Sequence, residues 1–203
     1  MHTSIWMVRH GQTELNRARR YQGTLDSPIT CYGRRQNDAL ASRLRGVPLT
    51  TVITSPCNRA RTTAASILEQ RQPLIPVLED SHWHEMHQGL WEGLTYDEVQ
   101  ERFSQDAQMR FADALHGRAS GGESLAEVAA RVQEGWQTLL RDYVGERVLL
   151  VTHALPIQIV LCTISGMPID LFWRWRIDLG SVTGINIYAG GPIIRMVNEV
   201  PPL

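Results

Sequence analysis

Two short apolar runs in the chain each stop abruptly at polar residues that include a histidine. Residues 5–8 are followed by Arg9 and His10, and residues 147–152 are followed by His153. Apolar runs of this length predict buried strands, and the glycine after His10 lets the backbone turn sharply and approach a ligand closely. In open α/β sheets, ligands bind beyond the carboxyl ends of the strands. If the two strands are neighbours, both imidazoles therefore face one crevice.

The remaining pattern predicts the fold class. The predicted elements are helices over 31–45, 58–71 and 125–143, a strand over 51–54, an extended piece over 74–78 framed by Pro73 and Pro76, and a hairpin of 182–188 and 193–200 around the turn 189–192. This order is typical of an open, mainly parallel α/β sheet with helices on both faces and an antiparallel closing edge. We expect a single domain over 1–203. Residues 80–120 break the alternation, so we expect a helical lid there, with helices about 96–103 and 107–115.

Composition excludes several classes of function. The net charge of −1 provides no overall basic field, so we expect neither nucleic acid nor a membrane as a partner. Three widely spaced cysteines suggest no disulfide framework and no zinc knuckle. The sequence shows no secretion signal and no apolar stretch long enough to cross a bilayer, which predicts a cytoplasmic protein.

A small set of side chains could carry phosphate chemistry. Arg9 offers a planar fork that suits phosphate or carboxylate, and His10 can attack or transfer a proton near neutral pH. Arg59 is predicted at the start of a helix, where free N–H groups favour an anion. Glu85 lies between aromatic residues and beside a glycine turn, a setting that can raise a carboxyl pKa toward 7. With His153, this set suits metal-free phosphoryl transfer.

Other interpretations of these residues compete with phosphate chemistry. Each histidine could merely satisfy local backbone groups, and Glu85 could be an exposed loop residue. A metal site competes because His82, His84 and His87 cluster, but their spacing is one residue short of the helical zinc-protease motif and no acidic cluster accompanies them. The phosphate loop, the dinucleotide-binding glycine turn and the serine nucleophile elbow are all missing. Nucleotide-driven chemistry and serine hydrolysis therefore lose support, and we expect no metal and no cofactor.

The assembled motifs resemble those of the histidine phosphatase superfamily, the phosphoglycerate mutase-like proteins. The matching blocks are Val8-Arg9-His10-Gly11-Gln12-Thr13 with Asn16, the Gly23, Asp26, Pro28-Ile29-Thr30 and Gly33 spacing, Ser55-Pro56 through Arg59-Ala60 with Thr63-Ala64, Glu85 with Gly89, Trp91, Glu92 and Gly93, Gly122-Glu123-Ser124, and Val151-Thr152-His153. They occur in order from about residue 5 to 155. The resemblance therefore implies a phosphoglycerate mutase-like fold and enzyme activity on phosphate esters.

The resemblance also implies roles for individual residues. His10 would be the nucleophile that becomes phosphohistidine, with Arg9, Arg59 and His153 around the transferring phosphoryl group and Glu85 as the acid/base residue. The implied phosphate or substrate contacts are Asn16 and Gln22, with Ala154 and Leu155 in the pocket wall. Three positions depart from the family pattern: Ala154 replaces a usual glycine, Gln158 a common arginine and Thr62 a frequent glutamine. None is among the five core residues, although the pocket near residues 154–155 could differ.

Three functions stay open, with a phosphomonoesterase acting on a small phosphorylated metabolite favoured. The alternatives are a cofactor-dependent phosphoglycerate mutase and, less favoured, a non-catalytic protein that binds phosphorylated ligands. Mutases of this family tend to carry extra basic residues in the lid. Residues 94–120 hold Arg102, Arg110 and Arg118 against Asp97, Glu98, Glu101, Asp106 and Asp113, which favours water as the phosphoryl acceptor. A homodimer could form through Leu171 to Trp175.

Overall fold

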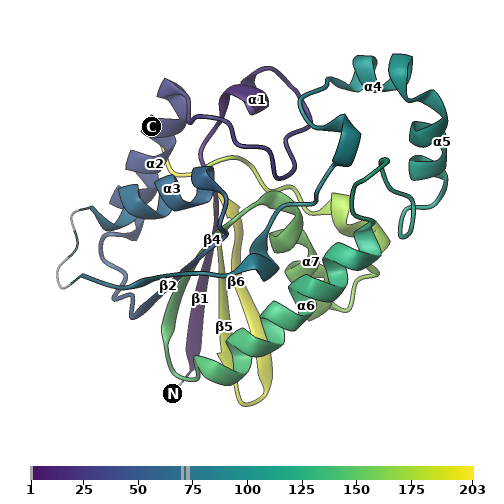
Figure 1. Ribbon diagram of the computed structural model, residues 1–203. Coiled ribbons are helices and arrows are strands. Elements are labelled where there is room, and N and C mark those ends of the chain that lie inside the picture. Colours follow the sequence, from purple (N-terminus) through teal and green to yellow (C-terminus); the bar gives the residue numbers. More distant parts are fainter. Residues whose placement is uncertain (1, 70, 72–73) are drawn as a thin grey trace.

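The computed structural model describes residues 2–69, 71 and 74–203, and its centre is one six-stranded sheet in the order β3-β2-β4-β1-β5-β6 (Figure 1). The strands are β1 (Thr3–Arg9), β2 (Thr51–Thr54), β3 (Val77–Glu79), β4 (Arg147–Thr152), β5 (Val182–Tyr188) and β6 (Gly191–Glu199). The pairs β1–β4, β4–β2 and β2–β3 are parallel, whereas β5 is antiparallel to β1 and to β6. This topology confirms the predicted mainly parallel sheet with an antiparallel edge.

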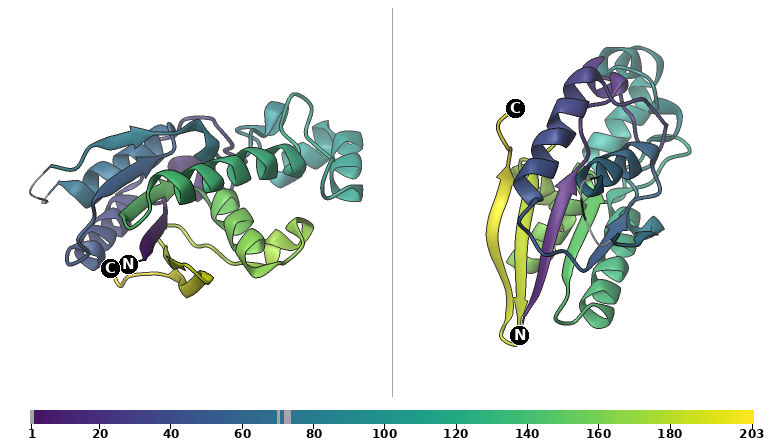
Figure 2. Two further views of the ribbon diagram at one scale, coloured as in Figure 1. Left: turned by 90° about the horizontal axis from the view of Figure 1, so that it is seen from below. Right: turned by 90° about the vertical axis from the view of Figure 1, so that its left-hand side faces the viewer.

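Helices cover both faces of the sheet (Figure 2). They are α1 (Glu14–Arg17), α2 (Cys31–Leu44), α3 (Asn58–Leu68), α4 (Tyr96–Arg102), α5 (Ser104–Ala112), α6 (Leu125–Asp142) and α7 (Ala154–Ser165), with 3-10 turns η1 (Ser81–Trp83), η2 (Gly89–Trp91) and η3 (Ile169–Arg174). Successive side chains of a strand point to opposite faces. Ile5 and Met7 therefore pack with α6 and α7, while Trp6 and Val8 pack with α2 and α3. Burial on both faces explains why residues 5–8 of β1 are an uninterrupted apolar run.

The strand register brings the two histidines to the same edge of the sheet. In the parallel pair β1–β4, Arg9 is opposite Thr152, so His10 and His153 follow at equivalent positions. Strand β2 lies on the other side of β4, with Thr54 opposite Val151. Consequently the segments after β1, β4 and β2 all leave the sheet at its carboxyl edge, where ligands bind in open α/β sheets.

Several boundaries differ from the predictions for local reasons. Helix α1 forms inside the predicted loop because Thr13 and Asn16 make a capping box there. Helix α5 begins at Ser104 and ends at Ala112, since the Asp113 carboxylate accepts the N–H groups of the next turn at positions 115 and 116. Helix α3 ends at Leu68; position 70 of the predicted helix and Pro73 lie outside the described residues.

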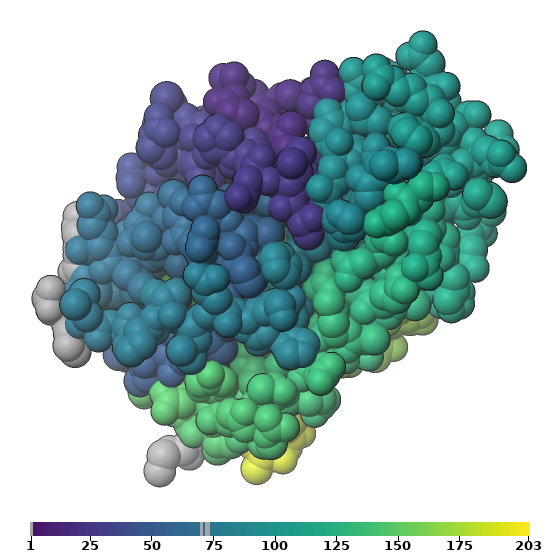
Figure 3. Space-filling view, in the orientation of Figure 1, coloured from purple at the N-terminus to yellow at the C-terminus, as the bar shows by residue number. Residues whose placement is uncertain are grey.

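The predicted lid region forms a layer of its own beside the sheet. Trp91, Val99, Ala107 and Ala119 make a small buried cluster against which Tyr21 packs. The space-filling view shows this teal region against the purple N-terminal segment (Figure 3). Among the residues described, no helix is both apolar enough and long enough to cross a membrane. The single-domain organisation and a dimer through residues 171–175 stay predictions.

Candidate active site

The two strand-end histidines face each other across a buried centre. The ring centroids of His10 and His153 lie 5.1 Å apart, with the planes at 66°. His10 is 3% exposed and His153 is fully buried. His10 reaches this position because the chain turns at Gly11, where a Cβ would come within 2.5 Å of the Asn37 side-chain oxygen. The first turn after β1 is therefore packed too tightly against α2 to accept any side chain at Gly11.

Arg59 lies between the two imidazoles. It is the second residue of α3 and 1% exposed, and its Nε donates to Nε2 of His10 at 3.1 Å and to Nδ1 of His153 at 3.2 Å. Its terminal nitrogens donate to the carbonyl oxygens of Gly23 at 2.6 Å and Leu25 at 3.3 Å. A planar guanidinium with five N–H donors can make all of these bonds in one orientation. Arg59 is thus fixed beside both histidines.

The hydrogen bonds assign the protons on both rings. Nδ1 of His10 lies 2.8 Å from the carbonyl oxygen of Gly11, which can only accept, so Nδ1 carries the proton and Nε2 keeps its lone pair. Nδ1 of His153 accepts from Arg59, so in the neutral ring Nε2 carries the proton and donates to the Ser55 hydroxyl at 2.8 Å. Ser55 is buried, and the role of its hydroxyl was not anticipated although the residue stands in a matching motif.

Burial and the neighbouring cations keep these imidazoles neutral. Burial, together with the charges of Arg59 and Arg9, holds the pKa of His10 well below its usual 6.5. The pKa of His153 is likewise well below 6.5, first through burial and then through Arg59 and the other groups around it. A neutral imidazole retains a nucleophilic lone pair. Nε2 of His10 is therefore an unprotonated nitrogen beside a cation at pH 7.

Arg9 supplies the second cation of this centre. Its Nη1 donates to the carbonyl oxygen of Ile177 at 2.6 Å, while its Nε is buried with no partner among the residues that the structure describes. Burial lowers the pKa of Arg9, and the carboxylates of Glu85 and Asp178 act against that lowering. An arginine does not lose its proton in proteins. A buried guanidinium N–H without an acceptor therefore marks a place where an anion can bind.

Glu85 lies in the segment between η1 and η2. Its Oε1 accepts the backbone N–H of Met86 at 2.9 Å, and its charge is felt by Arg9. The side chain is half-buried, so it is reachable by solvent and lies at the margin of the centre. The structure thus brings His10, Arg59 and His153 into direct contact, with the cation of Arg9 and the carboxylate of Glu85 close enough to influence it.

The four predicted substrate contacts are more varied in position. The Asn16 side-chain oxygen accepts the N–H of Thr13 in the α1 capping box. The Gln22 amide is buried, accepting from the Thr13 hydroxyl at 2.8 Å and donating to a loop carbonyl. Ala154 and Leu155 begin α7 directly after His153, and the Leu155 side chain belongs to the core beneath α6 and α7. Substrate contact by these residues stays a prediction.

The three histidines of the alternative metal hypothesis each contact a different side chain. His82 pairs with Asp80 at 2.7 Å, and His84 lies 3.3 Å from the Cys57 sulfur. His87 approaches the Glu92 carboxylate at 3.8 Å. Over 2–69, 71 and 74–203, no group of three or more His, Cys, Asp or Glu side chains is arranged to hold a metal ion.

A further contact, which sequence reasoning did not find, joins Glu92 to the loop that binds Arg59. Glu92 Oε1 accepts the N–H of Thr24 at 2.8 Å and the N–H of Gln88 at 3.2 Å. It therefore fixes the loop whose neighbouring carbonyls bind Arg59. In the sequence Glu92 is recognisable only as part of a motif, because nothing in the local pattern reveals its partner 68 residues away.

Comparison with known proteins places these motifs in a family. Residues 5–200 match the model of the histidine phosphatase superfamily (branch 1). Phosphoserine phosphatase 1 of Hydrogenobacter thermophilus is 29% identical over 192 residues, which cover 95% of this chain and 90% of that protein. A protein of Serratia proteamaculans named probable phosphoglycerate mutase GpmB is 34% identical, over 98% of this chain and 94% of its own.

The fold has solved counterparts. The alpha-ribazole phosphatase from Shigella flexneri superposes with a TM-score of 0.90 at 27% sequence identity, covering 98% of this chain and 97% of that chain. The relatives thus include named phosphatases and a named mutase, at similar levels of identity.

Proposed function

Because this chain belongs to the histidine phosphatase superfamily, we propose that it is a phosphomonoesterase that hydrolyses a small phosphorylated metabolite through a phosphohistidine on His10, without a metal. One observation carries the proposal. Arg59 Nε is shared by the lone-pair nitrogens of His10 and His153, with the unpartnered Nε of Arg9 buried in the same centre. Neutral imidazole beside fixed cations suits attack on a phosphoryl group, because the cations stabilise its negative oxygens.

The reaction follows from the assigned protons. The lone pair of His10 Nε2 attacks phosphorus, and the bond from phosphorus to the ester oxygen breaks. Glu85, protonated at that moment, gives its proton to the leaving oxygen. In the second half, Glu85 takes a proton from water as the water oxygen attacks phosphorus. The bond from phosphorus to Nε2 of His10 breaks, which releases phosphate and returns the lone pair to that nitrogen. Arg9 and Arg59 would donate to the phosphoryl oxygens in both halves, and His153 would lie beside the same group with its N–H held by Ser55.

The lid supports water as the acceptor. Of its three arginines, Arg118 is paired with Glu127 at 3.0 Å, and Arg110 donates to the Met86 sulfur at 3.4 Å. The charge of the third, Arg102, acts on the Glu98 carboxylate. A mutase must retain a bisphosphorylated intermediate, which needs cations for a second phosphate. The names of the relatives, which include phosphoserine and alpha-ribazole phosphatases, are consistent with a small phosphorylated substrate.

The first test compares hydrolysis with transfer. Purified protein should release phosphate from 4-nitrophenyl phosphate, with activity unchanged by a chelator and abolished in His10→Ala. A sensitivity to chelator would restore the metal hypothesis. Interconversion of 2- and 3-phosphoglycerate without phosphate release would favour the mutase, and phosphate-ester binding without any turnover would favour the non-catalytic protein. A panel of phosphorylated metabolites ranked by kcat/KM would then identify the substrate class.

The second test addresses the acid role. Glu85→Gln keeps an oxygen near the Met86 N–H but cannot transfer a proton. We expect kcat/KM for alkyl phosphates to fall by roughly 10²–10⁴, the usual range for general acid catalysis, and aryl phosphates to fall much less because their leaving groups need no proton. Equal losses for both classes would remove Glu85 from this role.

A further inference from the structure

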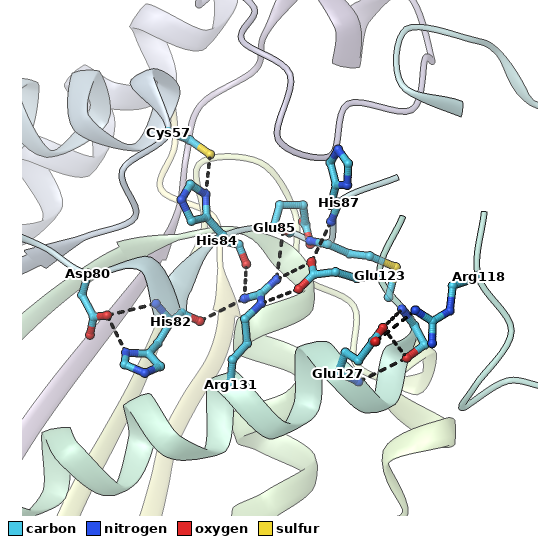
Figure 4. Close-up of polar contacts among 12 residues, drawn as sticks. Cys57, Asp80, His82, His84, Glu85, His87, Arg118, Glu123, Glu127 and Arg131 are labelled. Atoms are coloured by element: carbon cyan, nitrogen blue, oxygen red, sulfur yellow. Dashed lines mark hydrogen bonds and ion pairs between the residues drawn. The ribbon is translucent and has the colours of Figure 1, made fainter. Parts of the chain in front are cut away.

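The segment that carries Glu85 has its backbone held by side chains from other elements. Four successive carbonyl oxygens, those of residues 82–85, accept hydrogen bonds. Arg131 of α6 donates to the carbonyls of residues 82, 84 and 85 at 3.0, 2.8 and 3.1 Å, and the Thr152 hydroxyl of β4 donates to that of residue 83 at 2.6 Å. Figure 4 shows the Arg131 guanidinium reaching into this segment. Irregular backbone can be rigid when its polar groups are satisfied in this way.

Glu123 completes the arrangement from the other side. Its two carboxylate oxygens accept from Arg131 Nε at 2.8 Å and Nη2 at 2.9 Å, a bidentate pair (Figure 4). One of these oxygens also accepts the backbone N–H of His87 at 2.8 Å. Arg131 therefore binds the carbonyl of Glu85 itself, and Glu123 binds the N–H two residues later. The backbone is therefore held by hydrogen bonds immediately before and after Met86.

Arg131 and Glu123 are themselves held in place by the capped and buried helix α6. Helix α6 begins just after Glu123, with Ser124 and Glu127 in a capping box. The helix then buries Val128 and Val132 in the core, on either side of Arg131 along the chain. The side chains of Arg131 and Glu123 are 20% and 27% exposed, so water screens their attraction only in part. Bidentate arginine–carboxylate pairs combine charge with fixed geometry.

We propose that Arg131 and Glu123 are positioning residues that hold the Glu85 carboxyl where it can protonate the leaving oxygen. This inference rests on the proposed function. Neither Arg131 nor Glu123 makes a hydrogen bond to His10 or His153. Both residues therefore act through the backbone of residues 82–87. Misplacement of a catalytic group by about 1 Å can cost 10²-fold in rate. Loss of the Arg131–Glu123 pair should therefore slow the proton transfer from Glu85 and leave the rest of the reaction unchanged.

The kinetic test compares two esters in three variants. Arg131→Gln removes the charge and most of the donors, and Arg131→Lys keeps the charge without the planar fork. Arg118→Gln is the control, because Arg118 is also ion-paired to a glutamate, Glu127 in the first turn of α6, and its ion pair involves no residue of the Glu85 segment. We expect Arg131→Gln to lower kcat/KM for an alkyl phosphate about 10- to 100-fold more than for 4-nitrophenyl phosphate. Arg131→Lys should be intermediate and Arg118→Gln unchanged.

A double variant separates positioning from folding. If Arg131 acts through Glu85, then Glu85→Gln combined with Arg131→Gln should cleave the alkyl ester no more slowly than Glu85→Gln alone. A structural defect would instead multiply the two losses. Equal losses for alkyl and aryl esters in Arg131→Gln, or no loss, would overturn the proposal.

Amide hydrogen exchange gives a readout that needs no activity. In Arg131→Gln, the amides of residues 86–88 should exchange at least about tenfold faster than in the wild type, because local opening then costs less. Exchange in β1 and β4 should not change, and Arg118→Gln should match the wild type throughout. Unchanged exchange at residues 86–88 would overturn the positioning role. If the wild type hydrolyses no phosphate ester but this exchange accelerates, the proposed function fails while the hold on the segment stands.

Discussion

Replacing Ser55 with alanine removes the acceptor that sets which nitrogen of His153 carries a proton. Both residues are fully buried, and the Nε2–Oγ distance is 2.8 Å. The ring cannot escape by moving its proton to Nδ1, because that nitrogen faces the Nε–H of Arg59 at 3.2 Å and two donors would then meet. The variant must therefore leave the His153 N–H without an acceptor or tilt the ring away from its place, and it also removes the longer bond that the Cys57 N–H donates to the Ser55 hydroxyl at 3.4 Å.

The size of the effect follows from that orphaned group. A buried donor left unsatisfied costs about 1–3 kcal/mol, which should appear as a loss in the free energy of unfolding. For a domain of this size, each 1 kcal/mol lowers Tm by about 2–4 °C. The same energy holds the productive orientation of His153. Since 1.36 kcal/mol corresponds to a tenfold change in rate, kcat/KM should fall roughly 5- to 150-fold.

The assay is urea unfolding and 4-nitrophenyl phosphate hydrolysis on Ser55→Ala and a control. Ser66→Ala is suitable because Ser66 is a half-buried serine of α3 whose hydroxyl donates to the Thr62 carbonyl one turn earlier and not to either histidine. We expect the control to match the wild type in both measurements. Wild-type stability and wild-type kcat/KM in Ser55→Ala would show that the Ser55 hydroxyl does not set the state of His153.

Two further predictions concern stability. The pKa values of His10 and His153 are lowered first by burial, so below pH 6.5 the unfolded chain binds two protons that the folded chain does not. The free energy of unfolding should therefore fall as the pH drops through 6.5. Urea titrations at several pH values should show that this free energy depends less on pH in His153→Gln than in the wild type. Gly33→Ala would place a Cβ 2.2 Å from the Gln12 carbonyl oxygen, whereas a Cβ at Gly46 meets nothing within 4 Å. We expect Gly33→Ala to lower the free energy of unfolding by at least roughly 1–3 kcal/mol and Gly46→Ala to leave it nearly unchanged. Equal urea unfolding midpoints for the two variants would contradict this packing.

Local sequence patterns determined most of the fold. The strand over 51–54 and the first strand of the hairpin, 182–188, have the predicted bounds, because β-branched runs and turn residues act over a few positions. The helix over 31–45 was predicted to within one residue of its end, and the Thr30 side chain before it accepts the N–H of Gly33. Where the prediction failed, local side-chain contacts inside polar segments decided the boundary: the capping box of Thr13 and Asn16 begins α1, and the Asp113 carboxylate turns the chain after α5.

The sequence by itself also determined which side chains the strands deliver to the carboxyl edge of the sheet, since a histidine after a buried strand can only emerge there. Tertiary structure alone decided how those groups are arranged. Arg59 meets His153 across 94 residues, Ser55 meets it across 98, and Arg131 reaches the Glu85 carbonyl across 46. Proton positions depend on which donor faces which acceptor at about 3 Å. Helix and strand periodicity carries no information at that distance, so only the packed chain could reveal it.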